Sequence, residues 1–312
     1  MRILLWHVHG SWTTSFVQGR HEYVVPVLDG RGPDGRGRAR TWDWPSTVLE
    51  MGPKEVADTD FDLVVLQRPH ELNGLAAGWL GGRSPGRDIP AIYVEHNAPQ
   101  GRIADMRHPA AGRADLTLVH VTHFNALFWD AAGTRTVVVE HGIVDPGPRY
   151  TGDLPRAACV INEPVRRGRV TGTDLLESFG RTVPVDLFGI GAAALGGIEN
   201  LVQDQLHDAM ARRRVYLHPI RWTSLGLSLI EAMHLGMPVV ALATTEVVAA
   251  VPPGAGVVDT RLDFLRRALS RFVAEPEEAA LAGKKAREAA LDRYGLDRFL
   301  TAFDVLFEEV TA

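Results

Sequence analysis

The sequence predicts an α/β protein with two doubly wound halves. Apolar runs of strand length alternate with helix-length segments along almost the whole chain, which is typical of βαβ units. Several runs are continuously apolar, as expected of parallel strands that are covered on both faces. A segment rich in Pro and Gly, residues 145–154, separates two sets of these runs. The expected strands are RILLWHV, DLVVLQ, AIYVEH, LTLVHV, TVVVEH, AACVIN, VPVDLFGI, RVYLHP, PVVALA and GVV.

Composition narrows the class of protein. A chain of 312 residues suits two domains, and 46% hydrophobic with 23% charged residues indicates a globular protein. The net charge of −5 argues against nucleic-acid binding. The single cysteine, Cys159, excludes an intrachain disulfide, and we expect a cytoplasmic protein without a secretory signal. No apolar run approaches the roughly 20 residues of a membrane span, although a peripheral membrane contact stays open.

Three features of the first half are candidates for ligand contact. Gly10 follows the first strand, where open α/β sheets place their ligand loops, although a plain turn before a helix explains it equally well. His96 follows the strand AIYVE at the same edge and either contacts a ligand or bonds to nearby backbone. Residues 29–40 contain four arginines and four glycines. We expect a flexible, solvated loop there, and the alternative is a basic lip for an anionic acceptor or a lipid headgroup.

In the second half, Arg166, Arg167 and Arg169 cluster just past the predicted strand AACVIN. A guanidinium can grip a phosphate group through two parallel hydrogen bonds, so this cluster suits a nucleoside diphosphate. The alternative is an exposed basic turn. Gly189 follows the next strand in a glycine-rich run whose spacing does not fit a dinucleotide fingerprint.

The most informative segment is residues 215–240, VYLHPIRWTSLGLSLIEAMHLGMPVV. It predicts a strand, a loop with Gly226, a helix that carries Glu231, and a second strand. Free N–H groups and the helix dipole at such a helix start favour an anion. A carboxylate one turn inside can accept hydrogen bonds from a ribose diol. The alternative is a buried strand–helix unit with no ligand.

This segment resembles the sugar-donor-binding motif of the retaining GT-B glycosyltransferases of family 4. That motif has a strand ending in proline, a glutamate, a G-F-G-L loop, and a second glutamate eight residues after the first. Here the loop glycine, the second glutamate and an E-A-M…G-x-P-V tail match, whereas Thr223 replaces the first glutamate. The resemblance implies that Glu231 binds the ribose of a nucleotide sugar. It also implies that the loop meets the phosphate or sugar of the donor through Thr223, Ser224, Leu225, Gly226 and Leu227.

The resemblance extends to the other candidates. His96 matches a histidine that contacts the transferred sugar, and Gly10 matches a loop that faces the acceptor and the donor phosphate. The three arginines lie where the family has a phosphate-binding arginine and lysine, with Thr171 at the place of the lysine. Gly189 falls near the nucleotide base, and Glu246 falls in a loop near the sugar donor. Glu140 and His141 replace a proline and an asparagine, and either line the cleft or pack at the hinge.

The implied fold is GT-B, in which two Rossmann-like doubly wound domains face each other across a cleft. Residues 1–148 would form the acceptor-side domain and residues 149–295 the nucleotide-sugar-binding domain. Residues 296–312 would form a helix that returns to the N-terminal domain. This helix has an apolar stripe that must be buried, and packing within its own domain is the alternative.

The function that the resemblance implies is transfer of a sugar, with retention, from a nucleotide-diphosphate sugar to a hydroxyl acceptor. The acceptor would be a small molecule, a glycan or a lipid-linked molecule, and no cofactor or metal would be needed. Amides, arginines and a helix start would stabilise the leaving diphosphate. A GT-B nucleotide-sugar epimerase and a non-catalytic sugar-nucleotide-binding subunit are the alternatives. The base, the sugar, the acceptor and the oligomeric state stay open.

Overall fold

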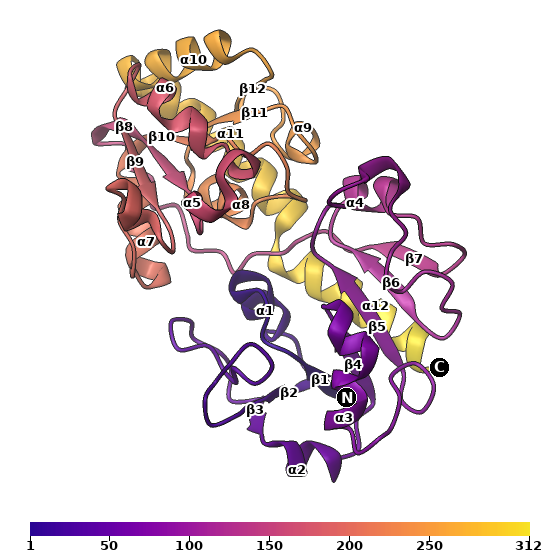
Figure 1. Cartoon of the computed structure of the whole chain (residues 1–312). Helices are drawn as coiled ribbons and strands as arrows, with labels where there is room; N and C mark the ends of the chain where they lie inside the picture. The colour runs from indigo at the N-terminus through magenta and orange to yellow at the C-terminus, as the bar shows by residue number, and fades with distance from the viewer. The chain divides into compact units, whose positions relative to one another are not determined.

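The computed structural model describes residues 1–312 and divides into two compact units. The first unit comprises Met1–Val144 together with Leu296–Ala312, and the second comprises Asp145–Gly295. Each unit contains one parallel β-sheet with helices packed on it (Figure 1). The α/β class predicted from the alternating apolar runs is therefore confirmed.

The first unit has a seven-stranded sheet in the order β3-β2-β1-β4-β5-β6-β7. Its inner strands are buried over nearly their whole length, which explains their continuous apolar sequences. The sequence pattern missed β2 and β3, which are short and lie toward one edge. The strand bounds are β1 Arg2–Leu5, β2 Glu22–Pro26, β3 Val48–Met51, β4 Leu63–Leu66, β5 Ala91–Glu95, β6 Thr117–His120 and β7 Arg135–Val138.

The C-terminal helix α12 belongs to the first unit, where it packs against α1 (Figure 1). The rings of Phe299 and Phe303 lie edge-on to Trp12, with centroids 6.1 and 5.9 Å away, and Phe303 also meets Phe16 at 4.9 Å. The apolar stripe is thus buried within this unit. The helices here are α1 Gly10–Phe16, α2 Pro53–Ala57, α3 Ala76–Trp79, α4 His123–Phe128 and α12 Leu296–Thr311, with a π-turn η1 Glu71–Leu75 and a 3₁₀ turn η2 Ile103–Asp105.

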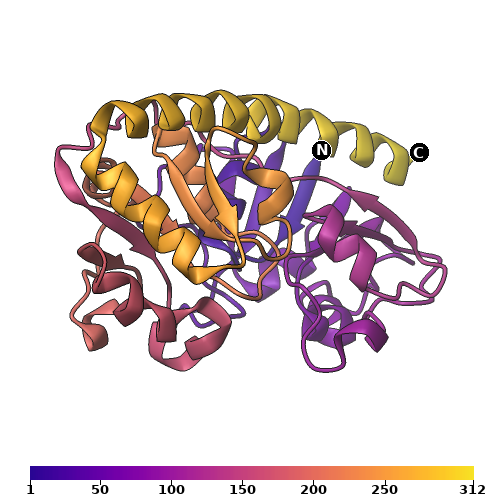
Figure 2. The ribbon, with the colours of Figure 1, turned by 90° about the horizontal axis from the view of Figure 1, so that it is seen from above.

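The second unit has a five-stranded parallel sheet in the order β12-β11-β10-β8-β9. Helix α10 packs against β8, β10 and β11, and Figure 2 shows it in gold beside the orange strands. The strands are β8 Leu154–Val160, β9 Val185–Phe188, β10 Arg213–His218, β11 Val239–Leu242 and β12 Gly256–Asp259. The helices are α5 Pro164–Arg167, α6 Leu176–Gly180, α7 Gln203–Ala211, α8 Leu227–Leu235, α9 Val247–Ala250, α10 Leu262–Ala274 and α11 Pro276–Tyr294, with 3₁₀ turns η3 Gly168–Thr171, η4 Thr173–Leu175 and η5 Ala192–Leu195.

The strand orders locate a topological switch point in each sheet. In the first sheet successive strands are added on one side of β1 up to β3 and on the other side from β4, so the order of the strands reverses between β1 and β4. In the second sheet it reverses between β8 and β10. Ligands of open α/β sheets bind beyond the carboxyl ends of the strands at such points. A ligand is therefore expected to contact the segments that follow these four strands. No helix in the structure is both long and apolar enough to cross a bilayer.

Candidate functional site

The turn into α8 lies at the switch point of the second sheet. Strand β10 ends at His218, and Gly226 is the N-cap of α8 with no side chain capping the helix start. A Cβ at Gly226 would lie 2.6 Å from Cε1 of His218, so any larger residue would collide with the buried imidazole. Close packing of this loop on the strand end therefore requires glycine, and Gly226 itself has no side chain that could cap the first-turn amides of α8.

Glu231 lies in the second turn of α8 and is only 5% exposed. Its Oε2 atom is 3.7 Å from Nε2 of His207, a buried residue of the neighbouring helix α7. The same ring nitrogen lies 2.7 Å from the side-chain nitrogen of Gln203. A buried carboxylate with a histidine beside it is a suitable acceptor for paired hydroxyl groups. The sequence pattern identified Glu231 but not His207.

The three arginines fall on α5 and on η3, directly after β8. Arg166 pairs with Glu163, and Arg169 pairs with Asp174 at 3.0 Å. Arg167 differs because its guanidinium makes neither a hydrogen bond nor an ion pair, and burial lowers its pKa from the ordinary value. A partly buried and unpaired cation at the edge of a sheet is an anion-binding candidate.

Backbone hydrogen bonds join the arginine segment to the α8 loop. The N–H groups of Arg221 and Trp222 both donate to the carbonyl of Val170, at 2.9 and 3.1 Å. The guanidinium of Arg221 also holds Asp174, with a 2.9 Å contact from Nη2 to Oδ2. The structure therefore brings the segments after β8 and β10 together. Arg221 was not among the residues that the sequence singled out, because its role depends on this pairing.

Gly189 and Glu246 have structural partners within the second unit. Gly189 has a φ of +130°, and a Cβ there would lie 2.4 Å from the carbonyl oxygen of Ile161, so the residue fits the two loops together. Glu246 is buried and accepts a 3.0 Å hydrogen bond from Arg293 of α11.

In the first unit, His96 lies just past β5 in a cluster of histidines. The ring centroids of His9 and His96 are 4.2 Å apart, and those of Trp12 and His96, which pack at nearly a right angle, are 4.8 Å apart. His141 is buried beside them. Burial, and then the neighbouring positive groups, lower the pKa of His9 to about 4 and that of His141 to about 3. Gly10 is the first residue of α1, directly after His9.

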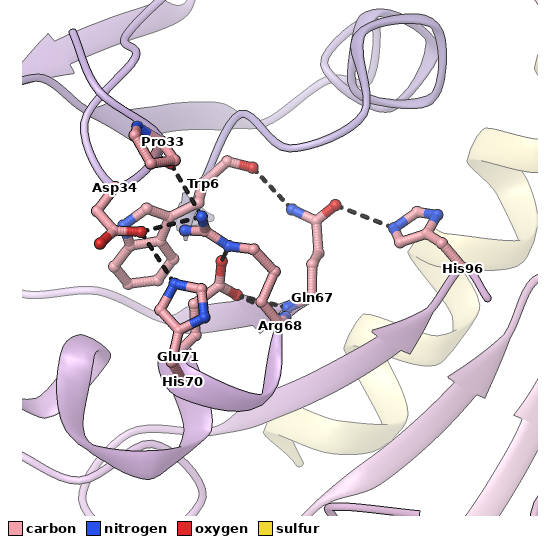
Figure 3. A network of polar contacts seen from close by, with 8 residues as sticks. All are labelled: Trp6, Pro33, Asp34, Gln67, Arg68, His70, Glu71 and His96. Atoms are coloured by element: carbon pink, nitrogen blue, oxygen red, sulfur yellow. Dashed lines mark hydrogen bonds and ion pairs between the residues drawn. The ribbon is translucent and has the colours of Figure 1, made fainter. Parts of the chain in front are cut away.

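The switch point of this sheet also carries a polar network, which Figure 3 shows. The Nε of Arg68 donates to Glu71, which is buried, and its Nη1 donates to the carbonyl of Pro33 at 3.0 Å. Asp34 pairs with Arg68 at 3.0 Å and with His70 at 2.9 Å. These bonds attach residues 29–40 to the segment that follows β4.

Residues 29–40 form an irregular, partly exposed loop, as expected, but hydrogen bonds attach it to the residues that follow. Arg31 and the backbone N–H of Arg38 both donate to Glu50, and the guanidinium of Arg38 donates to backbone carbonyls of Trp44, Pro45 and Val48. Two of the four arginines thus bond inward, while Arg36 and Arg40 remain exposed. Composition alone could not reveal these acceptors, because they come from residues 44–50.

A family model described as glycosyl transferases group 1 matches residues 193–260. This range lies within the second unit and includes the α8 loop and Glu231. No curated protein matches the chain in sequence.

Several solved structures have a fold similar to that of this chain. HepE from Anabaena, solved with UDP, has a TM-score of 0.68 and 13% identity, covering 99% of this chain and 100% of that chain. The sucrose-phosphate synthase of Thermosynechococcus elongatus also gives 0.68 and 13%, covering 99% and 98%. TarM gives 0.61 and 13%, covering 78% of this chain and 54% of that chain, so the alignment spans about half of TarM.

These likenesses confirm the predicted GT-B fold, the fold of these glycosyltransferases. The match to the group 1 model, which covers part of the second unit, supports a glycosyltransferase. Because these structural neighbours are only 13% identical, they indicate the fold of this chain but do not indicate its substrate.

Proposed function

We propose that the protein is a retaining, metal-independent glycosyltransferase of the family 4 type. It transfers a sugar from a nucleoside diphosphate sugar to a hydroxyl acceptor. The second unit binds the sugar donor, and the carboxyl edge of the first sheet contributes His96 and the Gly10 turn. The observation that carries the proposal is the switch point of the second sheet, where Arg167 and the glycine-capped start of α8 lie on joined segments.

The chemistry follows from charge. When the bond between sugar and phosphate breaks, the leaving diphosphate gains negative charge. Backbone amides at the start of α8 and the guanidinium of Arg167 are preorganised to stabilise that charge. Retention without an enzyme nucleophile has the leaving phosphate accept the proton of the incoming hydroxyl group. Glu231 binds the ribose and so fixes the position of the diphosphate.

Candidate sugar donors follow from the comparisons. HepE was solved with UDP and with UDP-glucose, and its fold covers this whole chain. UDP-sugars are therefore the first donors to test, followed by GDP- and dTDP-sugars. A donor that binds raises the melting temperature through mass action.

Incubation with each stabilising nucleotide sugar distinguishes the function classes. Release of the free sugar or its transfer to an added hydroxyl compound supports a glycosyltransferase. Conversion of the donor to an isomer indicates an epimerase. Binding without turnover indicates a non-catalytic subunit, for which Thr223, in place of the first glutamate, is the favouring observation. If no nucleotide sugar binds, the proposal is wrong.

The phosphate site has a specific test in Arg167→Gln. This change should weaken binding of UDP about tenfold to 100-fold, because it removes a charge-assisted contact, and should leave binding of uridine unchanged. Isothermal titration with both ligands measures the difference.

Arg166→Gln is the matched control, since Arg166 already pairs with Glu163 and is exposed. The control should keep most of the affinity for UDP. An equal loss for UDP in both variants would contradict the assignment of Arg167, and an equal loss for UDP and uridine would indicate a folding effect.

A further inference from the structure

Gln67 lies beside the histidine cluster of the first unit, and a backbone carbonyl fixes the orientation of its side-chain amide. Gln67 directly follows β4 and is 3% exposed. Its side chain lies between the backbone carbonyl of Trp6, at 2.7 Å, and the ring of His96, at 3.0 Å, as Figure 3 shows. This chain of contacts links β1, β4 and the segment after β5.

The direction of each hydrogen bond follows from the fixed carbonyl. A backbone carbonyl only accepts, so the amide nitrogen of Gln67 must face Trp6 and donate to it. The amide oxygen of Gln67 then faces His96 and can only accept. Consequently the Nε2 atom of His96 carries a proton, which it donates to Gln67. In a neutral imidazole the other nitrogen, Nδ1, then has a free lone pair.

The protonation state of His96 is also determined by its surroundings. Burial, and then the neighbouring His9 and His141, hold the pKa of His96 well below the ordinary value for histidine. Both neighbours also have a lowered pKa and are neutral near pH 7. The only hydrogen bond of the His96 ring is the one from Nε2 to Gln67, and the residue is 9% exposed. The lone pair of Nδ1 is therefore an acceptor that the protein does not use.

We propose that Gln67 is a positioning residue that holds His96 as its Nε2–H tautomer, so that Nδ1 accepts a hydrogen bond from a hydroxyl group of the sugar substrate. This inference rests on the proposed function for the identity of the ligand. The tautomer itself is a property of the free protein. The preferred ligand group is a hydroxyl, because a neutral acceptor gains nothing from an ether or a deoxy position.

The tautomer has a direct test in two-bond ¹H–¹⁵N NMR of the ligand-free, ¹⁵N-histidine-labelled protein. The variant His96→Asn identifies the His96 signals among the 12 histidines. We expect the Nε2–H pattern in the wild type and a mixture of tautomers in Gln67→Met, which keeps the side-chain length but cannot accept from Nε2–H. A Nδ1–H pattern in the wild type, or an unchanged pattern in Gln67→Met, would overturn the proposal.

Gln67→Glu separates positioning from packing. It keeps an oxygen acceptor for Nε2–H, so the tautomer should persist, although it removes the donor to the carbonyl of Trp6. The added carboxylate favours the imidazolium form and raises the pKa of His96, so Nδ1 becomes protonated in mild acid. We expect Gln67→Glu to retain more activity than Gln67→Met at pH 8, and to lose a larger share of its activity than the wild type does when the pH falls from 8 to 6.

The sugar-transfer rates of the two Gln67 variants distinguish a positioning role from a structural one. Gln67→Met should lower kcat about tenfold while the KM for the sugar donor changes little. Equal losses in Gln67→Met and Gln67→Glu at both pH values would show a merely structural residue and overturn the inference. If the wild type neither binds nor turns over any nucleotide sugar, the proposed function fails, and the NMR experiment still decides whether Gln67 sets the tautomer.

Discussion

At the scale of single residues, the environment of each charged group separates binding candidates from structural ones. Arg166, Arg167 and Arg169 are equivalent in the sequence, but two of them pair with carboxylates and Arg167 does not. A sequence can locate such a cluster from its place after a strand. It cannot show which cation is already neutralised, because Asp174 and Glu163 are assigned to their partners only by the folded backbone.

Glu231→Gln is predicted to weaken binding of UDP about tenfold to 100-fold, since a carboxylate accepts stronger hydrogen bonds from a ribose diol than an amide does. The wild type should also prefer UDP to its 2′-deoxy analogue, and the variant should lose that preference. Isothermal titration of both nucleotides measures the two effects.

The matched control is Glu177→Gln, on α6 in the same unit, where the exposed carboxylate pairs with Arg181. It should bind UDP as the wild type does. Unchanged affinity and unchanged ribose preference in Glu231→Gln would rule out the assigned role.

At the scale of elements, the pairing of Gly226 with His218 explains the α8 turn. Gly226→Ala would place its Cβ against the buried ring of His218. We predict a loss of about 1–3 kcal/mol in the free energy of unfolding, because overpacking forces rings off their preferred positions. Urea denaturation measures the loss.

The double variant Gly226→Ala/His218→Ala tests whether the contact with His218 causes this loss of stability. If the collision is with the imidazole, the two losses will be strongly non-additive, since removing the ring creates space for the new methyl group. Additive losses would locate the strain elsewhere in the loop.

The sequence pattern identified most of the strands and the long helices. Continuous apolar runs located β1, β4, β5 and β6, because strands covered on both faces need such residues. It missed the neighbouring strands β2 and β3, and β3 has the sequence VLEM, which contains no continuous apolar run. The hydrogen bonds that hold residues 29–40 were not predicted, because most of the acceptors lie outside the segment, at residues 44–50.

The same limit applies to the candidate sites. Glu231 and the Gly226 loop stood out through a local motif, and His96 through its place after a strand. His9, Gln67 and His207 did not stand out, because each is assigned by contacts between elements far apart in the chain. Spacing within one segment cannot encode such contacts.

At the scale of the whole molecule, buried neutral histidines in both units predict sensitivity to acid. The pKa of His141 and that of His218 are lowered to about 3 by burial, against 6.5 in an unfolded chain. Below pH 6.5 the unfolded chain binds protons that the folded chain excludes. Stability is therefore complete above pH 6.5 and falls as the pH drops toward 3. At pH 5 each of these histidines should cost about 2 kcal/mol.

The variant His218→Gln removes one of these titrations. The difference in unfolding free energy between pH 8 and pH 5 should be smaller in the variant than in the wild type by about 2 kcal/mol. Urea denaturation at both pH values measures this difference. An identical pH dependence in both proteins would mean that His218 is protonated as readily in the folded state as in the unfolded one.

The central claim is that the joined loops after β8 and β10 bind a nucleoside diphosphate. A crystal structure of the protein with the nucleotide sugar that raises its melting temperature most tests this directly. The account predicts that the diphosphate contacts the first-turn amides of α8 and the guanidinium of Arg167, with the ribose hydroxyls on Glu231. A well-ordered ligand bound elsewhere, with these groups free of it, would contradict the account.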